Sequence, residues 1–181
     1  MKNIYTNVDV GSDTIKVIVC ELFQNKLNLL AASSVKSKGI KKGLITNINE
    51  ATESLKEAFN EIESMLGVKV NKVIASIPAY FADFVYTKGE VRVNNEDGVV
   101  TGEDVVKVLQ VAMKSKITPT KELVTMIPID FSLDEQTNIK DPKGLVGSIL
   151  GTRAIMVTTP KKNIYSVVGL IESVGVEVID I

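Results

Sequence analysis

The sequence predicts an α/β fold of the mixed α+β kind, in which three helices separate short groups of strands. Apolar residues recur at helical spacing in three segments, and they alternate or run together over short stretches in eight others. The loops within the first strand group are too short for a crossover, so these strands should be antiparallel. The expected order is β-β-β-α-β, then β-α-β-β, then α-β.

The first helix is expected over about residues 50–66, where apolar residues recur every three or four positions. Asn47 or Asn49 is placed to cap its start, and Gly67 to cap its end. The apolar stripe of this helix consists of Leu55, Phe59, Ile62 and Leu66.

The second helix is expected to begin at Thr101-Gly102-Glu103-Asp104, a capping-box pattern with Asp in place of Glu. The third is expected to begin at Thr159-Pro160, with proline at the first helical position, and to end at Gly175. The stripes that should face the core are Val105, Val108, Leu109 and Ala112 in the second helix, and Ile164, Val167, Val168, Ile171 and Val174 in the third.

Strands are expected at 4–10, 15–23, 27–34, 73–77, 84–93, 123–133, 154–158 and 176–181. Residues 80–159 read as a separate strand-helix-strand-strand unit, inserted between two parts of an outer domain at 1–79 and 160–181. Inside this unit, residues 138–151 are polar and contain Gly and Pro, which is typical of a loop.

Composition excludes several classes of function. The 181 residues include no histidine and a single cysteine, Cys20, so the sequence contains neither a zinc site nor a Ser/His or Cys/His nucleophile. The net charge of −1 argues against a general nucleic-acid surface. No apolar run is long enough to span a membrane, and the N-terminus does not read as a signal peptide.

Residues 9–16 carry the most informative pattern, Asp-Val-Gly-Ser-Asp-Thr-Ile-Lys, between two strand-like runs. Backbone N–H groups and the hydroxyls of Ser12 and Thr14 can converge on a phosphate there, and Asp9 could hold a hydrated Mg²⁺. Asp, Gly, Ser and Thr are also ordinary turn residues, so a plain hairpin turn remains the alternative.

Three stretches together resemble the FtsA family of bacterial cell-division proteins, members of the actin-like ATPase superfamily. Residues 9–16 look like the superfamily's first phosphate loop. Residues 37–45, Ser-Lys-Gly-Ile-Lys-Lys-Gly-Leu-Ile, resemble the family's Gly-rich stretch before the first helix. Ile127-Pro128, followed by residues 141–145, resembles its inserted subdomain, called 1C.

The resemblance implies an incomplete actin-like (ribonuclease H-like) subdomain 1A at 1–79 and 160–181, with subdomain 1C inserted at 80–159. It implies ATP and Mg²⁺ as ligands of a longer parent protein, with Asp9 reaching the metal through water. The phosphate loop would then consist of Gly11, Ser12, Asp13, Thr14 and Lys16. Asp13 departs from the family's usual small or uncharged residue and would repel phosphate unless it turns outward or meets the metal.

The second phosphate loop of the family has no counterpart in this sequence, so the chain is expected to be a non-enzymatic fragment that binds no cofactor itself. The parent would be at most a weak ATPase that forms filaments with neighbouring subunits. It would link FtsZ to the membrane through a C-terminal helix outside this chain, in the cytoplasm at the division site. Residues 80–159 would receive cytoplasmic tails of later division proteins, with Asn138, Lys140, Asp141 and Lys143 as candidate contacts.

Two other classes stay open on the sequence alone. One is an actin-like adaptor of type IV pilus assembly, which looks similar and carries a comparable insertion. The other is an actin-like ATPase with real turnover, such as a sugar kinase, whose catalytic residues would follow residue 181. The Gly-rich stretch at residues 39–43 favours the division protein.

Overall fold

Strands β1 (Asn3–Val10), β2 (Thr14–Phe23) and β3 (Lys26–Lys36) are joined by short turns and pair as antiparallel neighbours, as expected. The computed structural model describes residues 3–114 and 117–181 of the chain. These residues form two units: unit 1 consists of Met1–Tyr80 and Lys162–Ile181, and unit 2 of Phe81–Lys161.

The sheet of unit 1 is completed by two parallel strands, β6 (Lys72–Ser76) and β11 (Glu177–Asp180), in the order β11-β6-β1-β2-β3. A short hairpin of β4 (Ile40–Lys41) and β5 (Leu44–Ile45) precedes the first helix, and the sequence did not predict it as strand. With only two residues in each strand, the hairpin is too short for an alternating pattern to reveal it.

Helix α1 (Ile48–Leu66) confirms the first expected helix and both of its caps. The Asn47 Oδ1 accepts hydrogen bonds from the backbone N–H groups of Asn49 and Glu50, at 3.1 and 3.3 Å. Gly67 ends the helix in the left-handed conformation that glycine adopts without a steric penalty, and its N–H donates to the Glu63 carbonyl at 2.8 Å.

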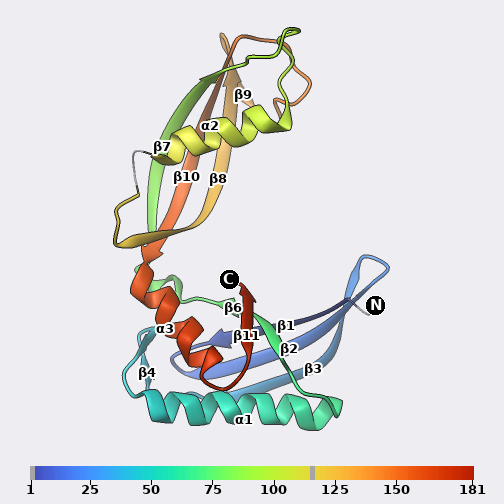
Figure 1. Cartoon of the computed structure of the whole chain (residues 1–181), viewed down its shortest axis with the longest axis vertical. Coiled ribbons are helices and arrows are strands. Elements are labelled where there is room, and N and C mark those ends of the chain that lie inside the picture. Colours follow the sequence, from blue (N-terminus) through green and yellow to red (C-terminus); the bar gives the residue numbers. More distant parts are fainter. Residues whose placement is uncertain (1–2, 115–116) are drawn as a thin grey trace. The chain divides into compact units, whose positions relative to one another are not determined.

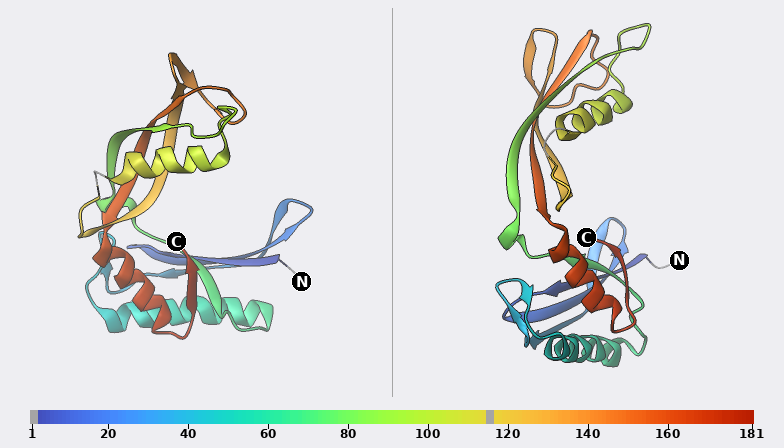
Figure 2. Two further views of the ribbon diagram at one scale, coloured as in Figure 1. Left: turned by 45° about the horizontal axis from the view of Figure 1, so that its top comes forward. Right: turned by 60° about the vertical axis from the view of Figure 1, so that its left-hand side comes forward.

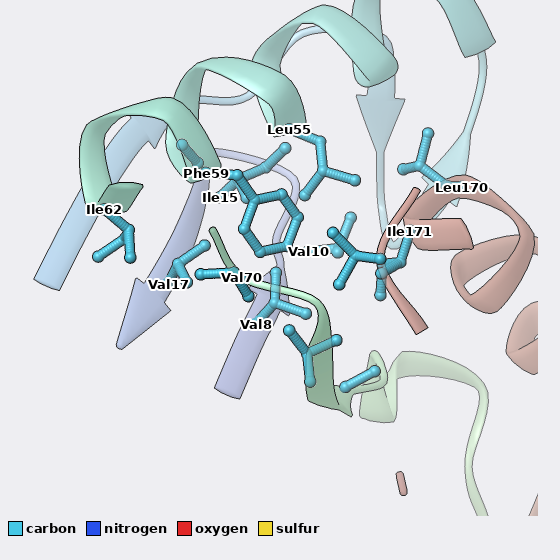
Figure 3. Packing of buried hydrophobic residues seen from close by; sticks show 14 of the residues in the cluster. Val8, Val10, Ile15, Val17, Leu55, Phe59, Ile62, Val70, Leu170 and Ile171 are labelled. Atoms are coloured by element: carbon cyan, nitrogen blue, oxygen red, sulfur yellow. The ribbon is translucent and has the colours of Figure 1, made fainter. Parts of the chain in front are cut away.

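The core of unit 1 lies between the sheet and the helices α1 and α3 (Lys161–Glu172). Figure 3 shows Leu55 and Phe59 of α1 and Leu170 and Ile171 of α3 converging on the inward-facing valines of β1 and β2. Alternate side chains of the same strands, such as Tyr5 and Ile18, point to the opposite face and are exposed.

Unit 2 contains β7 (Asp83–Arg92), α2 (Gly102–Lys114), β8 (Lys121–Leu133), β9 (Gln136–Ile139) and β10 (Ile149–Pro160). Its antiparallel sheet has the order β7-β10-β8-β9. Figure 1 labels these elements, and the expected strand-helix-strand-strand order is confirmed for β7, α2, β8 and β10. The capping box at the start of α2 is also confirmed, because Asp104 Oδ2 accepts from the Thr101 N–H at 2.9 Å and from its hydroxyl at 2.7 Å.

Helix α2 lies along one face of the unit 2 sheet (Figure 2). Gly89 of β7 permits this packing, because a Cβ there would lie 2.6 Å from both the Ala112 nitrogen and the Val108 carbonyl oxygen of the helix. Within the described part of unit 2, no helix covers the opposite face, where Phe84 and Tyr86 are exposed.

Three expectations about local structure are wrong. Pro160 is not the first residue of the third helix: it is the last residue of β10, and α3 begins at Lys161. The expected strand 154–158 is part of a longer strand, because β10 pairs with β7 from Ile149 onward and with β8 from Leu150 onward. The expected loop 138–151 is therefore strand at both ends, and its first residues belong to β9. Pairing across a sheet, which local composition does not report, extends these strands.

Candidate functional site

The expected phosphate loop lies where β1 ends and β2 begins. Its turn residues are Gly11, Ser12 and Asp13, while Thr14 and Lys16 already belong to β2. The turn is tight at Gly11, where a Cβ would lie 2.6 Å from the Thr14 carbonyl oxygen. The loop follows the carboxyl end of β1, which runs parallel to β6, and this end of parallel strands is where open α/β sheets bind ligands.

Asp9 lies one residue before the end of β1. It is directly opposite Lys16 of β2 and in register with Ser76 of β6. Its neighbours Val8 and Val10 face the core, so the Asp9 side chain projects from the other face of the sheet. Among the described residues, no group of three or more Asp, Glu, Cys or His side chains could hold a metal ion. A lone carboxylate at this position could contact a hydrated Mg²⁺ only through water.

Two contacts connect the loop to segments 23 and 31 residues away. The Asp13 carboxylate forms an ion pair with Lys36 of β3, so this carboxylate turns toward a lysine on the sheet and part of its charge is compensated. The Ser12 Oγ accepts a hydrogen bond from the Gly43 N–H at 2.8 Å, which brings the β4–β5 hairpin beside the loop. Neither contact follows from local sequence pattern, because each depends on how distant segments are brought together.

Unit 2 has a groove of about 310 Å³ on its sheet, lined by the second half of β7, the end of β8, β9 and the start of β10. Gly151 and Ser132 line the groove together with the charged side chains of Lys88, Glu90 and Arg153.

In the lining of this groove, Arg153 and Asp130 form an ion pair in which Nε donates to Oδ1 at 2.7 Å. The hydrogen bond from Arg153 holds the pKa of the Asp130 carboxyl below its ordinary value, although burial of the carboxyl acts in the opposite direction. The same bond raises the pKa of Arg153. Both groups therefore stay charged at neutral pH, and they fix the side chain of Asn138, whose Oδ1 accepts from Arg153 Nη2 at 3.1 Å.

The four candidate partner-binding residues have different surroundings. Asn138 lines the groove. The Lys140 ammonium donates to the Ile129 carbonyl at 3.1 Å, and the Asp141 carboxylate accepts from the Lys143 N–H at 3.1 Å, which closes a local turn. Lys143 is exposed. Sequence reasoning did not predict that Gly43 and Lys36 contact the loop, nor that Arg153 pairs with Asp130. The Gly-rich stretch around Gly43 was the one visible signal among them.

None of the helices in the described ranges is long and apolar enough to cross a membrane.

The chain is similar in sequence to known proteins. Residues 83–158 match the model of the SHS2 domain inserted in FtsA. The chain is 31% identical over 96% of its length to the cell division protein FtsA of Streptococcus pneumoniae, and 31% identical over 98% of its length to that of Bacillus subtilis. The FtsA of Enterococcus hirae is 29% identical over 96% of the chain. The chain spans 38–40% of the length of these curated relatives.

The fold is also similar to a solved structure, the PilM-PilN type IV pilus biogenesis complex. The TM-score is 0.62, and the match covers 98% of this chain and 47% of that one. At 12% identity this likeness concerns the fold alone, and it confirms the expected mixed α/β, actin-like class. Sequence likeness along nearly the whole chain and the SHS2 match agree: the chain is similar to the FtsA cell-division proteins, and residues 83–158 match the SHS2 domain inserted in them.

Proposed function

We propose that the chain is the N-terminal part of an ATP-binding adaptor of cell division, called the parent protein below. The parent forms actin-like filaments with neighbouring subunits, links FtsZ to the inner face of the cell membrane and recruits later division proteins. The likeness to FtsA over 96% of the chain carries this proposal. In this proposal the chain itself is a binding module, the parent is at most a weak ATPase, and a C-terminal helix outside the chain attaches the parent to the membrane.

The position and contacts of the loop at residues 11–16 support the nucleotide part of the proposal. Backbone N–H groups and two hydroxyls lie at the carboxyl end of a strand, where they can surround a phosphate. The ion pair with Lys36 reduces the main objection to this role, because part of the charge on the Asp13 carboxylate is compensated. In the proposal, Asp9 holds Mg²⁺ through water.

The chain by itself should bind Mg-ATP weakly or not at all. One loop in open solvent must hold the triphosphate without a second wall, whereas nucleotide pockets enclose most of their ligand. Calorimetric titration should show no saturable binding of Mg-ATP at micromolar concentrations to the chain, and saturable binding to the parent. Micromolar binding to the chain would contradict the argument that one loop cannot enclose the triphosphate. No binding to the parent would contradict the nucleotide proposal.

Charge at the loop offers a sharper test in the parent. Asp13→Asn should strengthen Mg-ATP binding, and Lys36→Ala should weaken it, because each changes the net charge beside the phosphates by one unit. Lys72→Ala is the matched control, since Lys72 is another exposed lysine of the same sheet, paired with Glu177. The two effects should shrink as salt rises from 50 mM to 500 mM, because exposed charges are screened. Equal affinities for all three variants would place the nucleotide elsewhere.

The open face and free edge of the unit 2 sheet support the partner-binding part of the proposal. The sheet order places β7 at an edge, where an extended peptide could pair with the backbone. The exposed side chains of Phe84, Tyr86 and Ile127 belong to β7 and β8, two of the strands that line a groove with charges of both signs. Lys140, Asp141 and Lys143 lie close in sequence to Asn138 at the groove, where charge can select among tails and set the encounter rate.

The test removes residues 80–159 from the parent and joins the flanks with a short linker. Later division proteins should then fail to reach the division site, while FtsZ attachment is kept. A second variant, Lys143→Glu, keeps the fold because the Lys143 bond to Asp141 uses the backbone N–H, not the side chain. If recruitment is normal in the deletion variant, the partner-binding role is wrong, and a filament-spacing role or no role at all remains.

The fold likeness to the PilM-PilN complex favours a second candidate, an actin-like adaptor of type IV pilus assembly. That likeness rests on 12% identity, against 26–31% for the cell-division relatives. The genes that flank the encoding gene separate the two functions: FtsZ as a neighbour supports the division adaptor, and pilus assembly genes support the alternative.

A further inference from the structure

The hydrogen bond between Gly43 and Ser12 determines what the Ser12 hydroxyl can do. A serine hydroxyl has one hydrogen to donate and can also accept. At Ser12 the oxygen accepts from the Gly43 N–H at 2.8 Å, and the contacts of the described residues include no acceptor for the hydroxyl's own hydrogen. Ser12 is exposed, so this hydrogen is available to a ligand oxygen on the open side of the loop.

The β4–β5 hairpin that presents Gly43 is firmly held at its base. Ile40 is buried in the unit 1 core, and Ile45 packs against that core. The Gly39 carbonyl accepts from the Thr46 and Asn47 N–H groups, at 2.7 and 3.0 Å. Because Asn47 is also the N-cap of α1, the hairpin is tied to the start of that helix.

The tip of the hairpin packs closely against Pro78. Gly43 has a φ of 73°, in the left-handed region, and a Cβ there would lie 2.7 Å from the Pro78 Cβ. The Gly43 N–H is therefore held in place from two sides, by the anchored hairpin and by Pro78. Lys41 and Lys42 precede it at the same tip, and both are exposed.

We propose that the β4–β5 hairpin is a positioning element of the phosphate loop. The Gly43 N–H occupies the Ser12 oxygen and thereby aims the Ser12 hydroxyl hydrogen at a ligand phosphate, while Lys41 and Lys42 add positive charge beside it. Gly43 is a positioning residue that acts through Ser12. This inference rests on the nucleotide binding proposed above and goes beyond it by making a second segment part of the site.

The test measures Mg-ATP affinity of the parent with four substitutions: Ser12→Ala, Ser12→Thr, Gly43→Ala and the double Ser12→Ala/Gly43→Ala. Ser12→Ala should weaken binding about tenfold or more, because a hydrogen bond to a charged group is lost. Ser12→Thr keeps the hydroxyl and should stay within a few-fold of the unsubstituted parent. Gly43→Ala keeps the backbone N–H but displaces it from Ser12 through the clash with Pro78. It should therefore weaken binding as much as Ser12→Ala does, and the double variant no further, since both lose the aimed Ser12 hydroxyl.

Gly67→Ala is the matched control for Gly43→Ala. Gly67 has nearly the same φ, 69°, but no atom lies within 4 Å of the Cβ position, so it carries the backbone strain without the clash. It should lower stability and leave affinity unchanged. If Gly43→Ala leaves affinity unchanged, or if the two single effects multiply in the double variant, the positioning role is overturned while the proposed function stands. If the unsubstituted parent binds no Mg-ATP, both the proposed function and this inference are wrong.

A second measurement on the chain itself covers the case in which Gly43→Ala does not fold. Amide hydrogen exchange at Gly43 should be several-fold faster in Ser12→Ala than in the unsubstituted chain, because the acceptor is gone. Exchange at Gly67, whose N–H donates to Glu63, should not change. Equal exchange at Gly43 in both proteins would show that the bond does not hold the hairpin, and would overturn the inference.

Discussion

The two units are stabilised in different ways. Twenty buried apolar side chains from two helices and the surrounding strands form one cluster in unit 1, whereas the cluster in the described part of unit 2 has five. In unit 1 the buried Ser33 hydroxyl donates to the Ala58 carbonyl of α1 at 3.0 Å. Unit 2 has the same kind of bond between its layers, from the Thr87 hydroxyl to the Ala112 carbonyl, and adds one within its sheet, from the Thr152 hydroxyl to the Asp130 carbonyl at 3.1 Å. Unit 1 is thus held mainly by apolar packing, and unit 2 relies more on specific contacts.

This difference follows from the number of helices available to each sheet. Two helices, α1 and α3, share the core of unit 1, while one helix of 13 residues covers the sheet of unit 2. A single helix buries a narrow stripe, so a backbone contact such as that at Gly89 and a satisfied polar pair such as Arg153–Asp130 carry more of the specificity. We expect unit 2 to be the more sensitive of the two to small steric changes.

Truncation of a core leucine should have the largest effect. Leu55 in unit 1 and Leu150 in unit 2 are both fully buried, and replacing either with Ala should cost about 2–5 kcal/mol of unfolding free energy. Leu55→Ala should fall at the upper end, because its many buried neighbours cannot close the cavity. Hydrogen exchange read by mass spectrometry should show lost protection only in the unit that carries the substitution. Equal losses in both units would mean that they unfold together, and the comparison would fail.

Gly89→Ala should be the next largest effect and specific to unit 2. Its Cβ would collide with the backbone of α2, so the helix must move away from β7, at a cost of about 1–3 kcal/mol. Gly169→Ala on α3 is the opposite case, because nothing lies within 4 Å of its Cβ position and Ala is the better helix former. It should stabilise unit 1 by about 0.5–1 kcal/mol. Thermal unfolding checks both signs, and a stabilising Gly89→Ala would rule out the close approach.

Removal of a helix N-cap should cost less unfolding free energy than these changes, and the cost should differ between the two units. Asn47→Ala removes the acceptor at the start of α1 and should cost about 1 kcal/mol. Thr101→Ala should cost somewhat more, because it also removes a hydrogen bond from the buried Asp104 carboxylate. Urea denaturation of both variants measures the difference. A larger loss for Asn47→Ala would mean that burial of Asp104 adds nothing to the α2 cap.

Lowering the pH should have the smallest effect, a loss of stability at the start of α2. The hydrogen bond from the Thr101 hydroxyl lowers the pKa of Asp104 below its ordinary value of 3.8. A carboxyl with a lowered folded-state pKa stabilises the fold above 3.8 and loses that contribution as the pH falls below it. Protonation weakens the cap without removing it, since one carboxyl oxygen still accepts.

Amide exchange in α2, compared between pH 5 and pH 3 after correction for intrinsic rates, should show this loss of protection. Asp104→Asn keeps an acceptor oxygen without a titrating group, so its protection should not change over the same range. An identical pH dependence in both proteins would assign the acid effect to other carboxyls, such as Asp130, whose pKa is lowered by Arg153.

Much of the local structure could be predicted because its causes lie within a few residues. The caps at Asn47 and Gly67 and the Thr101–Asp104 box are each set by side chains next to the helix end they serve. The third helix was less well placed. Leu170 is buried although it was left out of the expected stripe, and Val168 is only half-buried, because packing on the sheet selected a slightly different face.

The candidate sites were predictable only in part. The turn at residues 11–13 is visible as a Gly- and Ser-containing break between two strands, and its position at the end of β1 follows from that break. Its partners Lys36 and Gly43 lie 23 and 31 residues away. In unit 2, the groove depends on β9, a strand of four residues with a polar sequence and a left-handed Asn138, which reads as a loop until it is paired with β8.

The sequence by itself determined the order of the three helices and the longer strands, the ends of α1, the start of α2 and the antiparallel pairing of β1, β2 and β3, since periodicity, caps and short turns act over a few residues. Only the tertiary structure decided that β11 joins β6, that Asp13 meets Lys36, that Gly43 holds Ser12 and that Arg153 pairs with Asp130. Each of these contacts joins segments far apart in the chain. Their geometry is set by sheet register and core packing, which no single stretch of residues contains.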